Sequence, residues 1–178
     1  SLIELINHDK SKEMYVRKRL QKEIYNYGIK NEKFNNELRK FLITFSNKNS
    51  NNFLFSDLLV WFYIQNKELE MAFRQAKAID MKFDNYEETL FDIANNLITE
   101  KDYTQAIYVY DYIISKNKKD YLFYQAHAQK INLAFVSDNQ QLIKEVRENY
   151  DNYELDFPLN KITINFYSAY AKFQALHN

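Results

Sequence analysis

Hydrophobic residues recur along this chain at spacings of three and four positions, which is the period of one face of an α-helix. In residues 85–115 this pattern occurs twice, before and after a break at Thr99-Glu100-Lys101. The apolar positions on either side of the break are Leu90, Phe91, Ile93, Ala94, Leu97 and Ile98, then Tyr103, Ala106, Ile107, Tyr110, Ile113 and Ile114. The stretch therefore predicts two antiparallel helices joined by a tight turn.

Helix starts are marked by polar side chains. In a capping box, the first side chain and the side chain three residues later each bind the other residue's backbone N–H. Three pairs have this spacing: Asn85 with Glu88, Asp102 with Gln105, and Asp138 with Gln141. We expect a helix to begin at each of them.

The helical pattern returns at a spacing of about 34 residues. Stepping back from Ala106 leads to Ala72, and stepping forward from Ala94 leads to Ala128. The earliest copy, around Leu38, is the poorest. In the last copy the second helix slips by about two residues relative to this spacing, which predicts a longer first helix there.

The residues Leu90, Ile93, Ala94, Leu97, Ala106 and Tyr110 occupy the positions of the pattern W-x2-L-G-x2-Y…A-x3-F. The chain thus resembles a tetratricopeptide repeat protein with degenerate repeats, over residues 20–154. The resemblance implies an all-α fold in which antiparallel helix pairs stack as a right-handed superhelix, an α-solenoid of about nine helices.

The sequence predicts one repeat domain over residues 1–178, as part of a longer array. Its approximate repeats are 12–50, 53–84, 85–118 and 119–154, followed by a capping or orphan helix at 159–177 after Pro158. The expected helices are 11–27 with Gly28 as its C-terminal cap, 31–46, 53–65, 67–82, the hairpin 85–116, 120–136, 138–153 and 159–177. Leu2 to Ile6 resembles the tail of an earlier helix, so a segment excised from a longer protein is expected.

Composition narrows the function classes. One Gly and one Pro disfavour sheets with tight hairpins and Gly-rich phosphate loops. The absence of Cys excludes disulfides and leaves the redox compartment open, so localisation is not fixed. No run of eighteen apolar residues occurs, so we expect no membrane span in this chain.

Candidate catalytic groups are sparse. The three histidines, His8, His127 and His177, are far apart, and no second His or Cys follows His127 at helical spacing. We interpret His127 as a histidine hydrogen-bonded between helices. No hydrolase, metalloprotease or P-loop motif occurs, so we expect no catalytic, cofactor-binding or metal-binding residues and a protein that is not an enzyme.

Charge is unevenly spread. Residues 1–50 contain 11 Lys and Arg against 6 Asp and Glu, and residues 51–178 contain 13 against 18. The run Arg17-Lys18-Arg19 with Lys22 could contact phosphate or an acidic partner. The favoured interpretation is a solvated helix face with i,i+4 pairs, Glu13 with Arg17 and Arg19 with Glu23. Nucleic-acid binding is not favoured.

In tetratricopeptide proteins the first helices of successive repeats line a concave groove, so the resemblance implies a partner-binding surface. Helical spacing puts the candidate residues on one face of each first helix. These residues are Asp57, Trp61, Ile64, Phe91, Asn95, Ile98, Gln125, Gln129 and Asn132. The successive counterparts Trp61, Asn95 and Gln129 suit an extended peptide, with the ring as anchor. The alternative for Trp61 is ordinary packing between repeats.

Chaperone-binding members of this family hold a C-terminal carboxylate with lysine and asparagine. Asn95 fits the asparagine, but Phe91 and Asp57 stand where lysine would be needed. We therefore expect apolar and amide contacts, in a non-enzymatic scaffold that binds a protein or peptide in the groove. The alternatives are a structural or self-associating segment of a larger assembly, and an enzyme or nucleic-acid binder whose active part lies outside residues 1–178.

Overall fold

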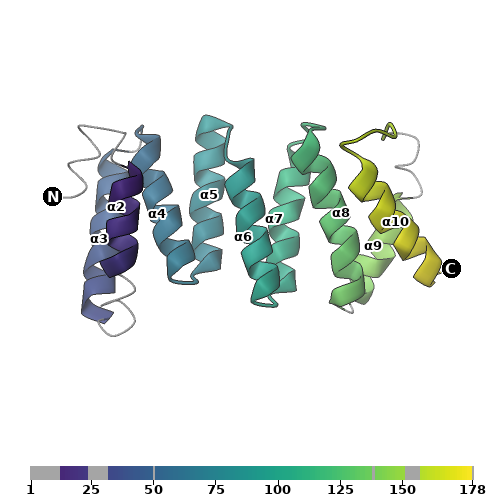
Figure 1. The fold of residues 1–178 in the computed structure, drawn as a ribbon, viewed down its shortest axis with the longest axis horizontal. Helices are drawn as coiled ribbons and strands as arrows, with labels where there is room; N and C mark the ends of the chain where they lie inside the picture. Colours follow the sequence, from purple (N-terminus) through teal and green to yellow (C-terminus); the bar gives the residue numbers. More distant parts are fainter. Residues whose placement is uncertain (1–12, 24–31, 50, 138, 151–156, 178) are drawn as a thin grey trace. The chain divides into compact units, whose positions relative to one another are not determined.

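A computed structural model describes residues 13–23, 32–49, 51–137, 139–150 and 157–177. Within these ranges the chain is all-α and contains no strand, as predicted (Figure 1). The helices are α2 (Glu13–Glu23), α3 (Glu32–Lys48), α4 (Phe53–Gln65), α5 (Leu69–Phe83), α6 (Glu87–Thr99), α7 (Tyr103–Ser115), α8 (Tyr121–Val136), α9 (Gln140–Tyr150) and α10 (Ile164–His177). None of these described helices is long and apolar enough to cross a bilayer.

The chain divides into two compact units, Ser1–Phe83 and Asp84–Asn178. The first is the N-terminal unit and the second is the C-terminal unit. The division falls within one residue of the predicted boundary between repeats 53–84 and 85–118. The prediction of one domain over the whole chain stays a prediction.

Neighbouring helices pack against each other within each unit. In the N-terminal unit α4 packs against α3 and α5. In the C-terminal unit α8 packs against α6, α7, α9 and α10, and α6 also packs against α7. Figure 1 shows consecutive helices of each unit running in opposite directions. The helix α8 is therefore the centre of the C-terminal unit.

Most positions that the repeat pattern marked as core are buried, although Leu38 in the earliest copy is only half-buried. Ala72 and its counterpart Ala106 are both 0% exposed, as is Ala94 across the turn from Ala106. Short side chains at these positions let the paired helices approach closely. Of the other predicted positions, Leu90, Ile93, Leu97, Tyr110, Ile113 and Ala128 are buried as well. In the earliest copy Leu42 is buried too.

The turns that close the two hairpins α4–α5 and α6–α7 have the same geometry, 34 positions apart. Lys67 has φ 57° and Lys101 has φ 62°. In each turn the backbone N–H of the next residue donates to the carbonyl five residues earlier. In the second hairpin Asp102 N donates to Leu97 O at 2.9 Å. In the first hairpin Glu68 N donates to Tyr63 O, also at 2.9 Å. Both are Schellman turns built on a lysine, where glycine is commonest.

Side-chain caps begin several helices. Asp102 accepts from Gln105 N at 3.1 Å, which confirms that capping residue. Asn52 and Asp120 cap α4 and α8 in the same way. The cap of α9 comes from Asn139, which accepts from Leu142 N at 3.0 Å. The predicted caps Asp138 and Gly28 lie outside the described residues.

The predicted cap at Asn85 is wrong. Tyr86 is the residue that precedes α6, and it makes no side-chain cap hydrogen bond. The reason is packing, because the Tyr86 side chain is only 4% exposed and burial fixes the start of the helix one residue later. Glu87 then lies in the first turn, where the helix N-terminus favours a carboxylate.

Two predictions about helices near the C-terminus, the length of α8 and the start of α10, had different outcomes. The helix α8 has 16 residues against 13 in α4 and in α6, which confirms the longer first helix. The last helix begins at Ile164, later than the predicted residue 159. Thr163 explains the delay, because its Oγ1 donates to Pro158 O at 2.8 Å and its own carbonyl accepts from Tyr167 N.

Candidate functional site

The nine predicted groove residues lie on three helices, with the same spacing on each. Asp57, Trp61 and Ile64 lie on α4 of the N-terminal unit. The other six lie on α6 and α8 of the C-terminal unit, namely Phe91, Asn95, Ile98, Gln125, Gln129 and Asn132. The structure brings α6 and α8 together, since these helices pack against each other. That Trp61 lines the same groove as Asn95 and Gln129 stays a prediction.

In the N-terminal unit, Asp57 is bound by a neighbouring helix. Arg17 of α2 forms an ion pair with Asp57, and the carboxylate side chain is only 14% exposed. Next to this pair, Gln21 Nε2 donates to Gln65 Oε1 at 3.4 Å. The predicted pair of Arg17 with Glu13 stays a prediction, because the Glu13 side chain lies outside the described residues. The predicted pair of Arg19 and Glu23 is confirmed at 3.2 Å.

On α6, the buried Tyr110 of α7 supports two predicted residues. Its ring meets the Phe91 ring edge-on, with centroids 5.4 Å apart. Its hydroxyl donates to Asn95 Oδ1 at 3.2 Å, and burial raises the pKa of this hydroxyl. The bond uses the oxygen of the exposed Asn95 amide, so its N–H groups can still donate to a partner. Ile98, one turn further on, is half-buried.

On α8, the three predicted residues differ in exposure. Gln125 is only 8% exposed and offers little surface to a partner. Gln129 and Asn132 are half-buried, and Asn132 Nδ2 donates to Gln129 Oε1 at 3.5 Å. This long hydrogen bond holds the two amides beside each other on the helix surface.

A pocket of about 450 Å³ lies where the C-terminal ends of α8 and α10 meet. It is lined by Asn132, Phe135, Val136, Lys172, Ala175 and Leu176. Of these, only Asn132 was predicted as a site residue. The sequence signal for this pocket was that α10 has more apolar residues than one buried face needs. In the structure one of them, Leu176, is 71% exposed.

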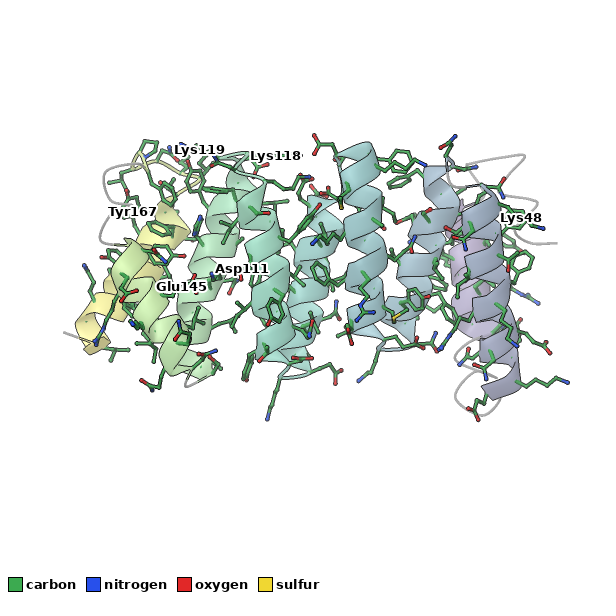
Figure 2. All side chains as sticks on the ribbon, turned by 180° about the vertical axis from the view of Figure 1, so that it is seen from behind. Lys48, Asp111, Lys118, Lys119, Glu145 and Tyr167 are labelled. Carbon is green, nitrogen blue, oxygen red and sulfur yellow. The ribbon has the colours of Figure 1, made fainter. Side chains whose placement is uncertain are left out.

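An ion cluster centred on the buried Lys130 joins α7, α8 and α9, and its two acidic side chains are partly exposed. Lys130 Nζ lies 2.6 Å from Asp111 Oδ1 and 2.7 Å from Glu145 Oε1. Figure 2 labels the two acidic residues, on α7 and α9. Burial lowers the pKa of Lys130, but hydrogen bonds to the two carboxylates outweigh it and the pKa is raised. The cluster is structural, because both acidic side chains are engaged by the lysine.

His127 is held inside the C-terminal unit, as interpreted from the sequence. Its Nδ1 lies 2.9 Å from the hydroxyl of Tyr150 on α9. The rings of Phe123, Phe157 and Phe166 surround it. Burial, with a contribution from the charge of Lys130, lowers the pKa of His127 to about 3. The imidazole is therefore neutral at physiological pH and serves packing.

A second ion cluster ties the turn after α7 to the start of α6. Lys116 and Lys118 both bind Glu87 and Asp84, with Lys116 Nζ 2.9 Å from Asp84 Oδ1. Hydrogen bonds from the two lysines lower the pKa of Asp84. Burial raises the pKa of Glu87, but the same lysines outweigh it and the pKa is lowered. These ion pairs hold the two ends of the α6–α7 hairpin together, so we interpret the carboxylates as structural.

The chain was compared with protein-family models, with curated proteins and with solved structures, and no match was found in any of the three.

Proposed function

We propose that the chain is a non-enzymatic scaffold of degenerate tetratricopeptide-like repeats, stacked as a right-handed superhelix. Its partner is a peptide or protein that binds along the first helices of the repeats. The concave groove of such a superhelix holds the partner through apolar and amide contacts.

The observation that carries this proposal is the repeated Schellman turn at Lys67 and Lys101. The same backbone geometry recurs 34 positions apart, which is the period of a tetratricopeptide repeat. Buried alanines recur with it at Ala72 and Ala106. Repeats of this kind cannot bury their apolar faces alone, so neighbouring pairs stack.

The partner's chemistry follows from the residues left on the first helices. On α6 and α8 these are the half-buried apolar Phe91 and Ile98, with the amides of Asn95, Gln129 and Asn132. Amide groups bind the backbone of an extended peptide, and apolar positions between them take its side chains.

The test is affinity capture from native extract with the full chain and with the variant Trp61→Ala/Asn95→Ala/Gln129→Ala. A matched control variant, Met71→Ala/Tyr108→Ala/Lys144→Ala, changes three exposed residues of second helices. All three proteins must show equal helicity and equal free energy of unfolding. A partner that the wild type and the control retain and the first variant loses supports the proposal. Equal capture by all three moves the site away from the first helices.

Trp61 is the expected anchor of the interaction. It is half-buried, so its ring keeps surface for a partner. With the captured partner in hand, Trp61→Ala should weaken binding by about 2 kcal/mol if the ring is a hot spot. The dissociation constant, measured by titration calorimetry, checks this. Unchanged affinity with an intact fold would assign Trp61 to packing instead.

One observation favours the alternative, a self-associating segment of a larger assembly. The segment around α10 exposes apolar side chains, with Leu159 74%, Ile164 54% and Leu176 71% exposed. Exposed apolar surface of this kind often marks an interface. Solution mass by light scattering over a range of concentrations distinguishes the two functions, because a strict monomer contradicts self-association.

A further inference from the structure

We propose that the pocket between the C-terminal ends of α8 and α10 takes a bulky apolar side chain of an acidic peptide segment. Lys172 at the pocket pairs with a carboxylate next to that anchor. The inference rests on the proposed function and specifies one subsite and one class of partner for it.

The size and walls of the pocket suit an apolar anchor. Its volume of about 450 Å³ lies within the range of small-ligand sites and accommodates one aromatic or leucine side chain with its backbone. One wall is fixed, because the Phe135 ring packs edge-on against Phe173 with centroids 5.6 Å apart. Val136, 60% exposed, and Leu176, 71% exposed, border it and lose water contact when the pocket fills.

The α10 residues that line the pocket are not part of the hydrophobic core of the C-terminal unit. The core face of α10 consists of Phe166, Ala169, Tyr170 and Phe173, all buried. Ala175 lies off that face and Leu176 lies at its edge, three residues after Phe173, and both side chains are exposed. A helix with apolar residues outside its packed face is typical of one that something else covers.

Charge decides what kind of segment covers it. Lys172 is exposed and is the only charged residue of the lining. Among the residues that the structure describes, it has no ion-pair partner. The carboxylates that α7 and α9 present to α8, Asp111 and Glu145, are already bound by Lys130. The pocket therefore offers one cation and no anion to a partner.

The net acidity of residues 51–178 does not reverse this preference. Charges beyond about 8 Å are largely screened at physiological ionic strength, so the local cation dominates. Asn132 adds an amide at the same pocket, and its bond to Gln129 holds it on the α8 face. An extended segment that lies over these amides can reach the pocket with one side chain.

The test uses blocked synthetic peptides with acetylated and amidated ends, so that no terminal carboxylate contributes. The probe has a Phe-Leu centre with two Glu on each side, and two controls replace either the four Glu by Lys or the centre by Ala-Ala. Binding to the full chain is measured by fluorescence anisotropy. The acidic apolar probe should bind, and each control peptide should bind at least about tenfold more weakly.

Two variants place the binding. Lys172→Glu reverses the local charge, and Ala175→Phe fills the pocket from an exposed position. Each should weaken binding of the acidic apolar probe about tenfold or more. Lys161→Glu makes the same charge change at an exposed position before α10, and affinity should stay within about twofold.

Four results would overturn the proposal: no binding of the acidic apolar probe, equal binding of the Lys-flanked probe, no effect of Lys172→Glu or Ala175→Phe, and an equal effect of Lys161→Glu. A lower solution mass of Ala175→Phe than of wild type would instead make a second copy of the chain the occupant. The proposed function fails separately, through equal capture by the Trp61→Ala/Asn95→Ala/Gln129→Ala variant.

Discussion

Equivalent positions in the two units do different work. At the first predicted groove position the N-terminal unit has Asp57, bound by Arg17 of another helix. The C-terminal unit has Phe91 at the corresponding position of α6, stacked edge-on against Tyr110 of its own hairpin. On α8 the position is Gln125, which is buried. These three positions, spaced 34 residues apart, therefore lie on helices in each case but carry side chains with different contacts.

The two units also differ in which elements the polar side chains of these helices join. In the N-terminal unit, ion pairing and the bond between Gln21 and Gln65 bridge α2 and α4. In the C-terminal unit, the polar residues of the face bond within one hairpin or one helix, as Asn95 and Asn132 do. The pocket at the ends of α8 and α10 also belongs to this unit.

The largest expected effect on stability comes from substitutions at Ala76 in the N-terminal unit and at Tyr110, 34 residues later, in the C-terminal unit. Both residues are 0% exposed. Tyr110→Ala should lower the free energy of unfolding by about 3–5 kcal/mol, because it leaves a cavity and frees Phe91 and Asn95. Ala76→Gly should cost only about 1 kcal/mol, through helix propensity. Urea unfolding followed by circular dichroism measures both. Similar costs for the two variants would contradict the difference drawn between the units.

A matched change at the same residue isolates the hydrogen bond. Tyr110→Phe keeps the ring contact with Phe91 and removes only the bond to Asn95. It should cost about 1 kcal/mol.

The next effect is a pH dependence of the C-terminal unit that comes from His127. Its pKa of about 3 lies below the ordinary 6.5, so the unfolded chain takes up a proton first as pH falls. The contribution of neutral His127 to the free energy of unfolding is therefore fully present above pH 6.5. Below that pH it falls by about 1.4 kcal/mol per pH unit, until the imidazole of the folded protein is protonated. Urea unfolding of wild type and His127→Gln at pH 7, 6 and 5 checks this. An equal slope in both proteins would assign the pH dependence to other groups.

The smallest effect sharpens the account of the N-terminal unit. The pair of Arg17 and Asp57 is partly buried and joins two helices. A double-mutant cycle with Arg17→Ala and Asp57→Asn should give a coupling energy of about 1 kcal/mol or less. The coupling should weaken in 1 M NaCl, since salt screens ion pairs. A cycle with Asn95→Ala and Tyr110→Phe serves as the comparison, because that bond involves no ion.

The helices were predictable because their signals are local. The predicted helix 53–65 has the bounds of α4, Phe53–Gln65, since an apolar run begins right after the capping residue Asn52. The cap at Asp102 was confirmed for the same reason. Local patterns failed where tertiary packing decided the boundary, as at Tyr86. They also failed before α10, where Leu159 and Ile162 continue an apolar pattern but the Thr163 hydroxyl bonds back to Pro158 and Asn160 and the helix begins only at Ile164.

The candidate site was predictable only in part. Repeat spacing placed residues such as Phe91, Asn95 and Asn132 on one face of their helices. It could not place Arg17 against Asp57, 40 positions away, because periodicity carries no information on which helices become neighbours. The pocket depends on the same information, since α8 and α10 contribute its walls from separate parts of the sequence.

The lysines at the two repeated turns have a consequence for how these helices end. A left-handed backbone costs a residue other than glycine about 1–2 kcal/mol. Lys67 and Lys101 each place a positive charge two residues beyond the C-terminal end of a helix, near the partial negative charge that the aligned peptide dipoles leave there. That attraction offsets part of the conformational cost. In this chain, which has a single glycine, one lysine at each turn can thus both adopt the left-handed backbone and place a positive charge near the C-terminal end of the helix dipole.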